Sequence, residues 1–521
     1  MFDKMTPNQR LMLAVALSVG FFALYTSIFP PQLEHEVSPQ TSDSSTLVVQ
    51  DSTIASKQGS AEVQKDVASS TIVSVKSDKF TLEVDTLGRI SSKKLLQEKY
   101  SGSDDAQAEL ISQDGHMPLF IRFAEPSLNE EASKVAYSSD ISSIVLKEND
   151  AARVVLTQQL SNLLVKKEIV FHSDGHYDVS ISMSEDKKYF IYLGSRPQIT
   201  KKLLAAVGAI VYTPDNDLVT IVEDGDANEK QIFQSVGMIS AFDQYLANLM
   251  YGFSKDTIIT LDRDRKSNPV VYFEGSKNIK FNGYLGPKDY KVLNSINPML
   301  TNAIEYGWFT FAAKPLFRLL SFLHGIFGNW GWAIIGLTII VRIVMFPLTH
   351  KGMVSMQKIK QIAPQMKELQ AKYKGDPQRL NAAMMDMYKK HGANPLGGCF
   401  PMLLQIPIFF AIYRVLLNAV ELQGAEWMFW VNDLSRMDPT FILPLLMGAS
   451  MYYQQKLTPS NFTDPLQEKI FKFLPVIFTF FFITFPSGLV LYWFVNNLFS
   501  IAQQFIVNRQ FKSPAKEVAT K

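Results

Sequence analysis

Apolar and polar residues divide the chain into blocks of different periodicity. The first 30 residues contain one continuous apolar run, LMLAVALSVGFFALYTSIF, and residues 31–70 are rich in Ser, Thr, Gln and Asp. In residues 71–312, stretches such as TIVSVKSDKFTLEVDT and HYDVSISMSED alternate apolar with polar positions, which is the pattern of β-strands. From about Trp330 onward the chain is mostly apolar, with short charged loops. The pattern predicts an N-terminal membrane anchor, a flexible linker, a β-sandwich domain and a helical membrane region.

Five apolar segments in the C-terminal part have the composition of membrane-spanning helices. They cover residues 329–350, 398–420, 439–455, 473–486 and 488–508. Only FPSG separates the last two, and one helix across both would be roughly 50 Å long, which exceeds the ~30 Å hydrocarbon core. Pro486 and Gly488 therefore predict a turn between two antiparallel helices. Together with the apolar run in residues 1–30, these segments would make six spans, four of them within residues 398–508.

The N-terminal run has two interpretations, an uncleaved anchor and a cleaved signal peptide. Lys4 and Arg10 supply the positive charge that both kinds of segment carry. No A-x-A cleavage site follows the run, which ends in Phe29-Pro30-Pro31. We therefore favour an uncleaved anchor over residues 1–30.

Lys and Arg residues orient the predicted spans, because cytoplasmic loops carry an excess of them. Residues 351–397 contain nine, and the tail, residues 509–521, is also basic. Residues 421–438 instead contain four acidic residues and one arginine. This alternation predicts that both termini are cytoplasmic and that the β-domain lies outside.

Residues 313–328 predict an amphipathic helix rather than a span. Leucines recur there at helical spacing, with basic residues around them: Leu316, Leu319, Leu320, Leu323, Lys314, Arg318 and His324. We expect this helix to lie in the outer membrane interface. The alternative is an additional turn of the following span.

Composition excludes several kinds of site. The chain has 521 residues, a net charge of +2 and one Cys, so it forms no disulfide within itself. No Cys/His cluster has the spacing of a metal site, and no phosphate-binding loop occurs, so neither a metal nor another cofactor is expected. No predicted span pairs a Ser or Cys with a His, and the acidic residues of the β-domain fit turns better than a catalytic pair. We therefore expect a protein that is not an enzyme.

The predicted span GWAIIGLTIIVRIVMFPLTH carries a charged residue, Arg342. Arginine at the centre of a spanning helix costs about 2.5–3.5 kcal/mol on insertion scales, so it rarely faces lipid. Polar side chains of other spans lie at a comparable depth in the cytoplasmic half, and no acidic residue does. We expect these side chains to face one another in a hydrophilic groove that is open to the cytoplasm. The candidate groove residues are Arg342, Thr338, Gln405, Asn496, Asn497, Ser500 and Gln503. For the amides alone, hydrogen bonding between helices is an equally good explanation.

The cytoplasmic segment, residues 351–397, predicts two helices broken at Gly375-Asp376-Pro377. Met353, Met356 and Met366 belong to an apolar stripe among lysines. Flexible thioether side chains suit a surface that meets varied apolar partners, so we interpret the segment as a hairpin that binds such partners. A basic hairpin lying on anionic lipid is the alternative, and the two interpretations are compatible.

Several motifs in the right order resemble those of a known family. The arginine in TIIVRIVMFPLT, the basic hairpin, NPLGGCFPMLLQIPIFFAIY and FPSGLVLYWFVNNL together resemble the YidC/Oxa1/Alb3 family of membrane protein insertases, over about residues 314–510. The N-terminal anchor and the external domain resemble the form found in Gram-negative bacteria. The resemblance implies a polytopic α-helical membrane protein of the inner membrane, with six spans and a five-helix insertase core. It also implies a large periplasmic all-β domain that resembles a supersandwich.

The same resemblance implies a function and partners. Nascent membrane proteins would enter the cytoplasm-facing groove, whose central arginine matches Arg342, and leave sideways into the lipid bilayer. The apolar slide that contacts substrate helices would include Ile406, Phe409, Phe481, Tyr492 and Trp493. Implied partners are the Sec translocon, the ribosome and the signal-recognition pathway, with no direct nucleic-acid specificity. Arg414 departs from the apolar character expected of the slide, and we expect it to extend outward or to pair with Glu421.

A secondary transporter for a small anion is the second hypothesis, with Arg342 as the binding charge. A transporter should contain internal repeats and polar residues on both sides of the midplane. The sequence contains no evident repeat, and its polar residues lie on one side. The insertase is therefore the favoured function.

Overall fold

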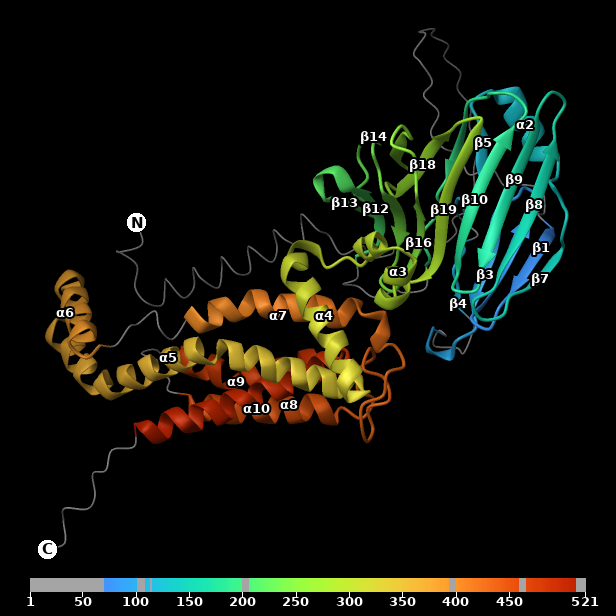
Figure 1. Ribbon diagram of the computed structural model, residues 1–521. Coiled ribbons are helices and arrows are strands. Elements are labelled where there is room, and N and C mark those ends of the chain that lie inside the picture. Colours follow the sequence, from blue (N-terminus) through green and yellow to red (C-terminus); the bar gives the residue numbers. More distant parts are fainter. Residues whose placement is uncertain are drawn as a thin grey trace, which may run out of the picture. The chain divides into compact units, whose positions relative to one another are not determined.

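The computed structural model describes residues 70–100, 108–112, 115–198, 206–392, 400–458 and 465–511 (Figure 1). The predicted anchor, nearly all of the predicted linker, Cys399 and the tail beyond Phe511 lie outside the described residues. Within them, strands occupy the chain as far as Pro287 and helices follow. The division into a large β-rich domain and a helical C-terminal region is therefore confirmed.

Among the residues that the structure describes, the β-rich domain contains three sheets. The first consists of β4 (Ala108–Glu109), β3 (Ile90–Leu95), β2 (Phe80–Asp85), β1 (Thr71–Lys76) and β7 (Ser143–Val145). The second consists of β13 (Leu218–Glu223), β12 (Gly208–Thr213), β15 (Met238–Phe242), β16 (Leu246–Tyr251), β19 (Asn278–Pro287), β10 (His176–Met183), β9 (Leu164–His172), β8 (Ala151–Gln159) and β6 (Ser138–Ser139). The third consists of β14 (Gln231–Phe233), β17 (Ile259–Arg263), β18 (Pro269–Gly275), β11 (Tyr189–Tyr192) and β5 (Ile121–Phe123). A short helix, α2 (Pro126–Lys134), follows β5.

The core of this domain encloses lysine side chains as well as apolar residues. Lys93 and Lys167 are at most 1% exposed. Nζ of Lys167 donates to the carbonyl oxygens of Gly88 at 2.6 Å and Leu119 at 3.0 Å. Nζ of Lys93 lies 4.0 Å from the centre of the Phe80 ring. Because burial disfavours the charged form, it lowers the pKa of each amino group from 10.5 to about 7.

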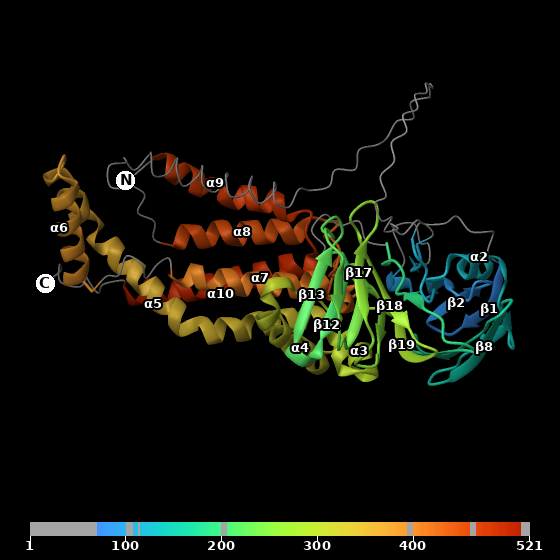
Figure 2. The ribbon, with the colours of Figure 1, turned by 90° about the horizontal axis from the view of Figure 1, so that it is seen from above.

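The helical region contains eight α-helices among the described residues. They are α3 (Tyr290–Ile296), α4 (Thr310–Phe327), α5 (Trp330–Lys372), α6 (Pro377–Lys390), α7 (Phe400–Asn418), α8 (Ile442–Leu457), α9 (Pro465–Phe482) and α10 (Ser487–Gln510). Helices α5, α7, α8, α9 and α10 run side by side in both views (Figures 1 and 2). By length and composition, α5 and α10 are long and apolar enough to cross a membrane, whereas the apolar stretch Gln405–Asn418 is shorter.

Two helices are longer than the sequence pattern predicts. Helix α5 continues without a break through Pro347 to Lys372, so the predicted span 329–350 and the first helix of the cytoplasmic hairpin form one element. A proline inside a helix removes a single hydrogen bond, and the surrounding residues maintain the helical backbone here. Helix α9 begins at Pro465, ahead of the predicted start at 473, and its 18 residues are roughly 27 Å long.

Backbone contacts fix the turn between α9 and α10. The N–H groups of Ser487 and Gly488 donate to the carbonyl oxygens of Arg436 at 2.7 Å and Leu434 at 2.9 Å. A Cβ atom at Gly488 would lie 3.1 Å from the Leu434 oxygen, so a larger residue would press against this contact. The turn therefore holds the start of α10 against the segment that precedes α8.

Candidate functional site

Arg342 is buried between α5 and α10. Its Nε donates to Oδ1 of Asn496 at 2.6 Å, and its Nη2 donates to Oγ of Ser500 at 2.6 Å and to the Asn496 carbonyl oxygen at 3.2 Å. The residue is 6% exposed. Among the residues that the structure describes, the guanidinium donates through Nε and Nη2 to amide, hydroxyl and carbonyl oxygens, and neither a carboxylate partner nor a partner of Nη1 is found. The charge is thus held by neutral oxygens alone.

A small cavity adjoins the guanidinium. Its lining comes from α5, α7 and α10, and consists of Val341, Arg342, Met345, Thr349, Gln405, Ile408, Tyr492 and Asn496. Its volume is ≈ 10 Å³, which is room for about one water molecule. Gln405 joins the cluster weakly, with Nε2 3.5 Å from Oδ1 of Asn496. The polar groups therefore converge around the guanidinium, and the cavity is too small for a polypeptide segment.

The two threonines of this helix differ in role. Thr338 is buried, and its hydroxyl donates to the Ile334 carbonyl oxygen of its own helix at 2.7 Å, so it does not belong to the cavity. Thr349, which was not among the predicted groove residues, lines the cavity and accepts a hydrogen bond of 2.8 Å from Nε2 of Gln503. The signal was present, because Thr349 follows Arg342 by seven residues and so lies on the same helical face.

Asn497 points away from the cavity, toward α8. Its Nδ2 donates to Oγ of Ser450 at 3.1 Å and to the Met447 carbonyl oxygen at 3.3 Å. The explanation that these amides join helices therefore fits Asn497, whereas Asn496 serves the arginine.

A second polar layer lies further along the same helices. Gln357 of α5 and Gln504 of α10 both donate to Oδ1 of Asn508, whose Nδ2 donates to the Leu457 carbonyl oxygen at the end of α8. This layer, which was not predicted from the sequence, joins α5, α8 and α10 through side-chain amides. None of its bonds involves the described residues of α7.

Aromatic side chains form a continuous row beside the polar cluster. The Trp493 ring lies edge-on to Phe409 of α7, with centroids 4.7 Å apart, and 5.2 Å from Phe482 of α9. Phe482 in turn contacts Phe481, which is 58% exposed. Tyr492 is buried and lines the cavity. The predicted slide residues Phe409, Phe481, Tyr492 and Trp493 thus meet, and sequence reasoning missed Phe482.

The remaining slide residue and the hairpin methionines lie in different surroundings. Ile406 is exposed on α7. Met366 is buried with Ile362 in a small core that includes Met384 and Tyr388 of α6. Met353 and Met356 are half-buried on α5. Met366 therefore holds the two hairpin helices together, and the other two methionines remain candidates for contact with a partner.

Arg414 does not pair with Glu421 in the structure. A Cβ atom built on Gly307 would lie 3.9 Å from the Arg414 guanidinium carbon, which places this cation beside η5 (Gly307–Phe309). The Glu421 carboxylate, in η7 (Val420–Leu422), instead accepts the Tyr290 N–H at 3.0 Å. Burial raises the pKa of Glu421 to about 7. Of the two alternatives expected for Arg414, the pair with Glu421 is therefore not formed, because the carboxylate caps α3 instead.

Two families match parts of the chain. The family described as "60Kd inner membrane protein" matches residues 322–516, and the family described as "YidC periplasmic domain" matches residues 255–319. The first covers the helical region with the Arg342 cluster, and the second covers the end of the β-rich domain and the start of the helices.

Individual relatives match over nearly the whole length. A protein of Campylobacter jejuni named "Membrane protein insertase YidC" is 46% identical, over 97% of this chain and 96% of the relative. A protein of Wolinella succinogenes with the same name is 45% identical, over 100% of this chain and 98% of the relative. Among solved structures, "Active YidC insertase crystal structure with the first transmembrane domain resolved" covers 86% of this chain and 95% of its own, with 16% identity and a TM-score of 0.36.

Proposed function

This chain belongs to the YidC family of membrane protein insertases, and on that basis we propose how its residues carry a nascent membrane protein into the bilayer. A hydrophilic segment of the substrate enters from the cytoplasm beside Arg342. Its transmembrane helix then leaves sideways into lipid along the aromatic row. The observation that carries the proposal is the buried guanidinium of Arg342, which has neutral partners only and faces a cavity with one donor nitrogen, Nη1, unused.

The polar cluster lowers the cost of bringing a hydrophilic tail into the membrane. A charged or amide-rich tail loses water as it enters, and preformed hydrogen-bond donors replace part of that hydration. Because Arg342 lacks a carboxylate partner among the described residues, an acidic tail gains an ion pair there without breaking an existing one. The cavity holds about one water molecule in this structure, so the proposal requires the helices that line it to separate when a tail enters.

The aromatic row supplies the exit. Phe481 is exposed at its end, and α9 presents further exposed apolar residues at helical spacing: Phe473, Val476, Ile477 and Phe480. A substrate helix that moves along this face buries apolar surface that water would otherwise contact. This burial stabilises it by about 25 cal/mol per Å². Met353 and Met356 would make the first contact with the substrate on the cytoplasmic side.

The membrane arrangement follows from the same family membership and the charge of the loops. We place six spans in the inner membrane, with the first in residues 1–30, and both termini in the cytoplasm. The β-rich domain then lies in the periplasm as a supersandwich, and α4 lies in the outer interface. The Sec translocon, the ribosome and the signal-recognition pathway are the partners that deliver substrates. No chemical reaction is assigned to the chain.

Site-specific photo-crosslinking tests the proposed path. A photoreactive amino acid replaces Phe409 or Trp493 in the row, or Phe322 on the exposed face of α4 as a control, and ribosome-bound chains of a single-span membrane protein are supplied. Adducts at the row positions and none at the control position are expected. Equal labelling at all three positions would contradict the path.

A further inference from the structure

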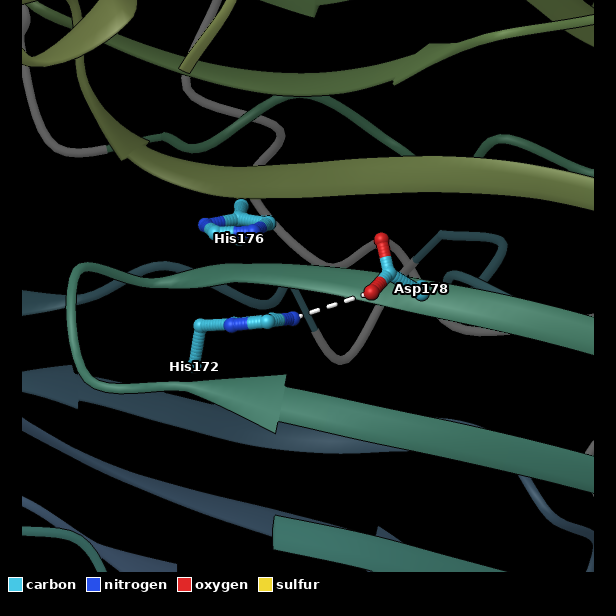
Figure 3. Close-up of side chains that lie close together, drawn as sticks. All are labelled: His172, His176 and Asp178. Atoms are coloured by element: carbon cyan, nitrogen blue, oxygen red, sulfur yellow. Dashed lines mark hydrogen bonds and ion pairs between the residues drawn. The ribbon is translucent and has the colours of Figure 1, made fainter. Parts of the chain in front are cut away.

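The β9–β10 hairpin brings two histidines and an aspartate together on one face of the sheet, as Figure 3 shows. His172 ends β9, His176 begins β10, and Asp178 lies two residues further along that strand and so on the same face. The His172 and His176 rings stack with centroids 3.8 Å apart, and Nε2 of His172 lies 2.9 Å from Oδ2 of Asp178. We propose that these three side chains bind a divalent transition-metal ion of the Zn²⁺ or Cu²⁺ type.

The donor set determines the class of ion. Two imidazole nitrogens and one carboxylate oxygen suit zinc and copper, whereas calcium and magnesium prefer an all-oxygen set. One ligand atom of each residue lies within 4.8 Å of the other two. Three protein ligands leave a fourth position of a tetrahedral ion for water or for a group from another molecule.

A neighbouring carboxylate orients the second histidine. Oδ1 of Asp174 lies 2.5 Å from Nδ1 of His176. A proton on Nδ1 of His176 would satisfy this carboxylate and leave Nε2 as the nitrogen available to an ion. Histidines that bind metals commonly donate their other ring N–H to a carboxylate in this way, which also makes the ligand more basic.

The backbone that carries the ligands is held from several sides. The Gly175 N–H donates to the His172 carbonyl oxygen at 3.1 Å, and the Gly175 φ of +96° favours glycine at this turn. Buried Lys93 donates from below to the Gly175 carbonyl oxygen at 3.2 Å. Strand β10 pairs with β9 on one side and β19 on the other. Binding an ion therefore orders side chains and leaves the main chain unchanged.

Only side-chain rotations are needed. Metal–ligand bonds of about 2.1 Å at a tetrahedral angle place two ligand atoms about 3.4 Å apart. The His172–Asp178 contact would widen from 2.9 Å to that distance, and the His176 ring would turn out of the stack. The side chains of His172 and His176 are 26% and 20% exposed, so an ion has access to both. No metal was expected from the sequence. These three residues come together only because β9 and β10 pair in this register.

The test uses the full-length chain in detergent micelles, purified through a tag without histidine. Titration with Cu²⁺, followed by electron paramagnetic resonance, should reveal one site with two coordinated imidazole nitrogens. Zn²⁺ should compete for this site and raise the melting temperature of the protein. His172→Asn and His176→Asn should each remove one nitrogen from the spectrum and weaken binding by at least about tenfold. Asp174→Asn should keep both nitrogens but weaken binding about 10- to 100-fold.

His391→Asn, which changes an exposed histidine of the helical region, is the matched control and should leave the spectrum unchanged. Circular dichroism and membrane insertion should be the same for all variants, since none lies in the Arg342 cluster. An unaltered Cu²⁺ spectrum and affinity in the doubly substituted His172→Asn, His176→Asn chain would overturn the proposal. So would a wild-type chain that binds neither ion more tightly than this double variant does.

Discussion

Nε2 of Gln405 on α7 lies 3.5 Å from Oδ1 of Asn496 on α10, at the outer limit of a hydrogen bond. The same oxygen accepts a bond of 2.6 Å from Arg342 on α5. Among the described residues, two layers of side-chain hydrogen bonds join α5, α8 and α10, and Gln405 is the side chain of α7 that reaches the first of them. Among the described side chains, α7 is therefore the helix that is most weakly bonded to the polar cluster.

Replacement of Arg342 should separate substrates by the charge of their translocated tail. Lys keeps the charge but loses the planar fork that binds Asn496 and Ser500, so insertion should fall only partly. Ala should reduce the insertion of single-span proteins with acidic tails about tenfold or more, with a smaller effect on neutral tails. Protease protection of the tail in cells depleted of their own insertase measures this. An equal loss for both tails would indicate that the arginine only hydrates or supports the helices.

Asn496→Asp should have a related effect without removing the arginine. The new carboxylate would lie beside the guanidinium and neutralise it, so acidic tails should insert poorly while neutral tails insert nearly normally. Asn497→Asp is the matched control, because Asn497 faces Ser450 on α8. Its effect should not depend on tail charge. If both variants reduce the insertion of acidic tails more than that of neutral tails, and by the same factor, an acidic tail does not interact with the charge of Arg342.

The packing of α8 on α9 should fail when Gly448 is enlarged. A Cβ atom there would overlap Oγ1 of Thr479, so one of the two helices would have to shift. Gly448→Ala should therefore destabilise the protein by about 1–3 kcal/mol, measured as a lower melting temperature in detergent. Gly325→Ala on α4, where a Cβ atom meets nothing within 4 Å, should not destabilise. Adding Thr479→Ala to Gly448→Ala should restore part of the loss, and no recovery would contradict this account of the contact.

The stability of the β-rich domain should rise with pH between about 7.5 and 9. The folded pKa of Lys93 and Lys167, about 7, lies below the 10.5 of an exposed lysine, so in this interval the unfolded chain binds more protons than the folded chain. Each lysine should add at most about 1.4 kcal/mol of unfolding free energy per pH unit. Urea unfolding followed by pulse proteolysis measures the slope. Lys167→Met should lower both the unfolding free energy and its slope against pH. An unchanged slope would contradict the lowered pKa of Lys167.

Substitutions in the cytoplasmic hairpin should separate substrate contact from folding. Met353→Ser with Met356→Ser should weaken crosslinking to nascent chains and leave the melting temperature nearly unchanged, because both side chains are half-buried. Met366→Ser should instead loosen the contact of α5 with α6, since Met366 is 8% exposed within the hairpin core. Protease cleavage near Gly375 reports that loosening. Unaltered crosslinking in the Met353→Ser, Met356→Ser variant would indicate that the hairpin binds lipid and not the substrate.

The sequence by itself determined the classes of structure and their order along the chain. Period-two alternation marked the β-rich domain, and long apolar segments marked the helices, because both signals depend on neighbours a few residues apart. The charge of Arg342 within an apolar segment was also sufficient to predict polar partners in other helices. That reasoning selected Asn496, Ser500 and Gln405 correctly as neighbours, since a buried charge must be solvated by the protein.

Tertiary structure alone decided which polar side chains meet. Asn496 and Asn497 are adjacent in the sequence, yet one binds Arg342 on α5 and the other binds Ser450 on α8, because successive helical residues point about 100° apart. Thr338 and Thr349 lie on the same helical face as Arg342, yet only Thr349 lines the cavity, and Thr338 bonds to the Ile334 carbonyl oxygen of its own helix. The His172–His176–Asp178 cluster depends on the register of two strands, which local pattern does not fix. Helix packing and strand register thus convert a list of residue types into specific sites.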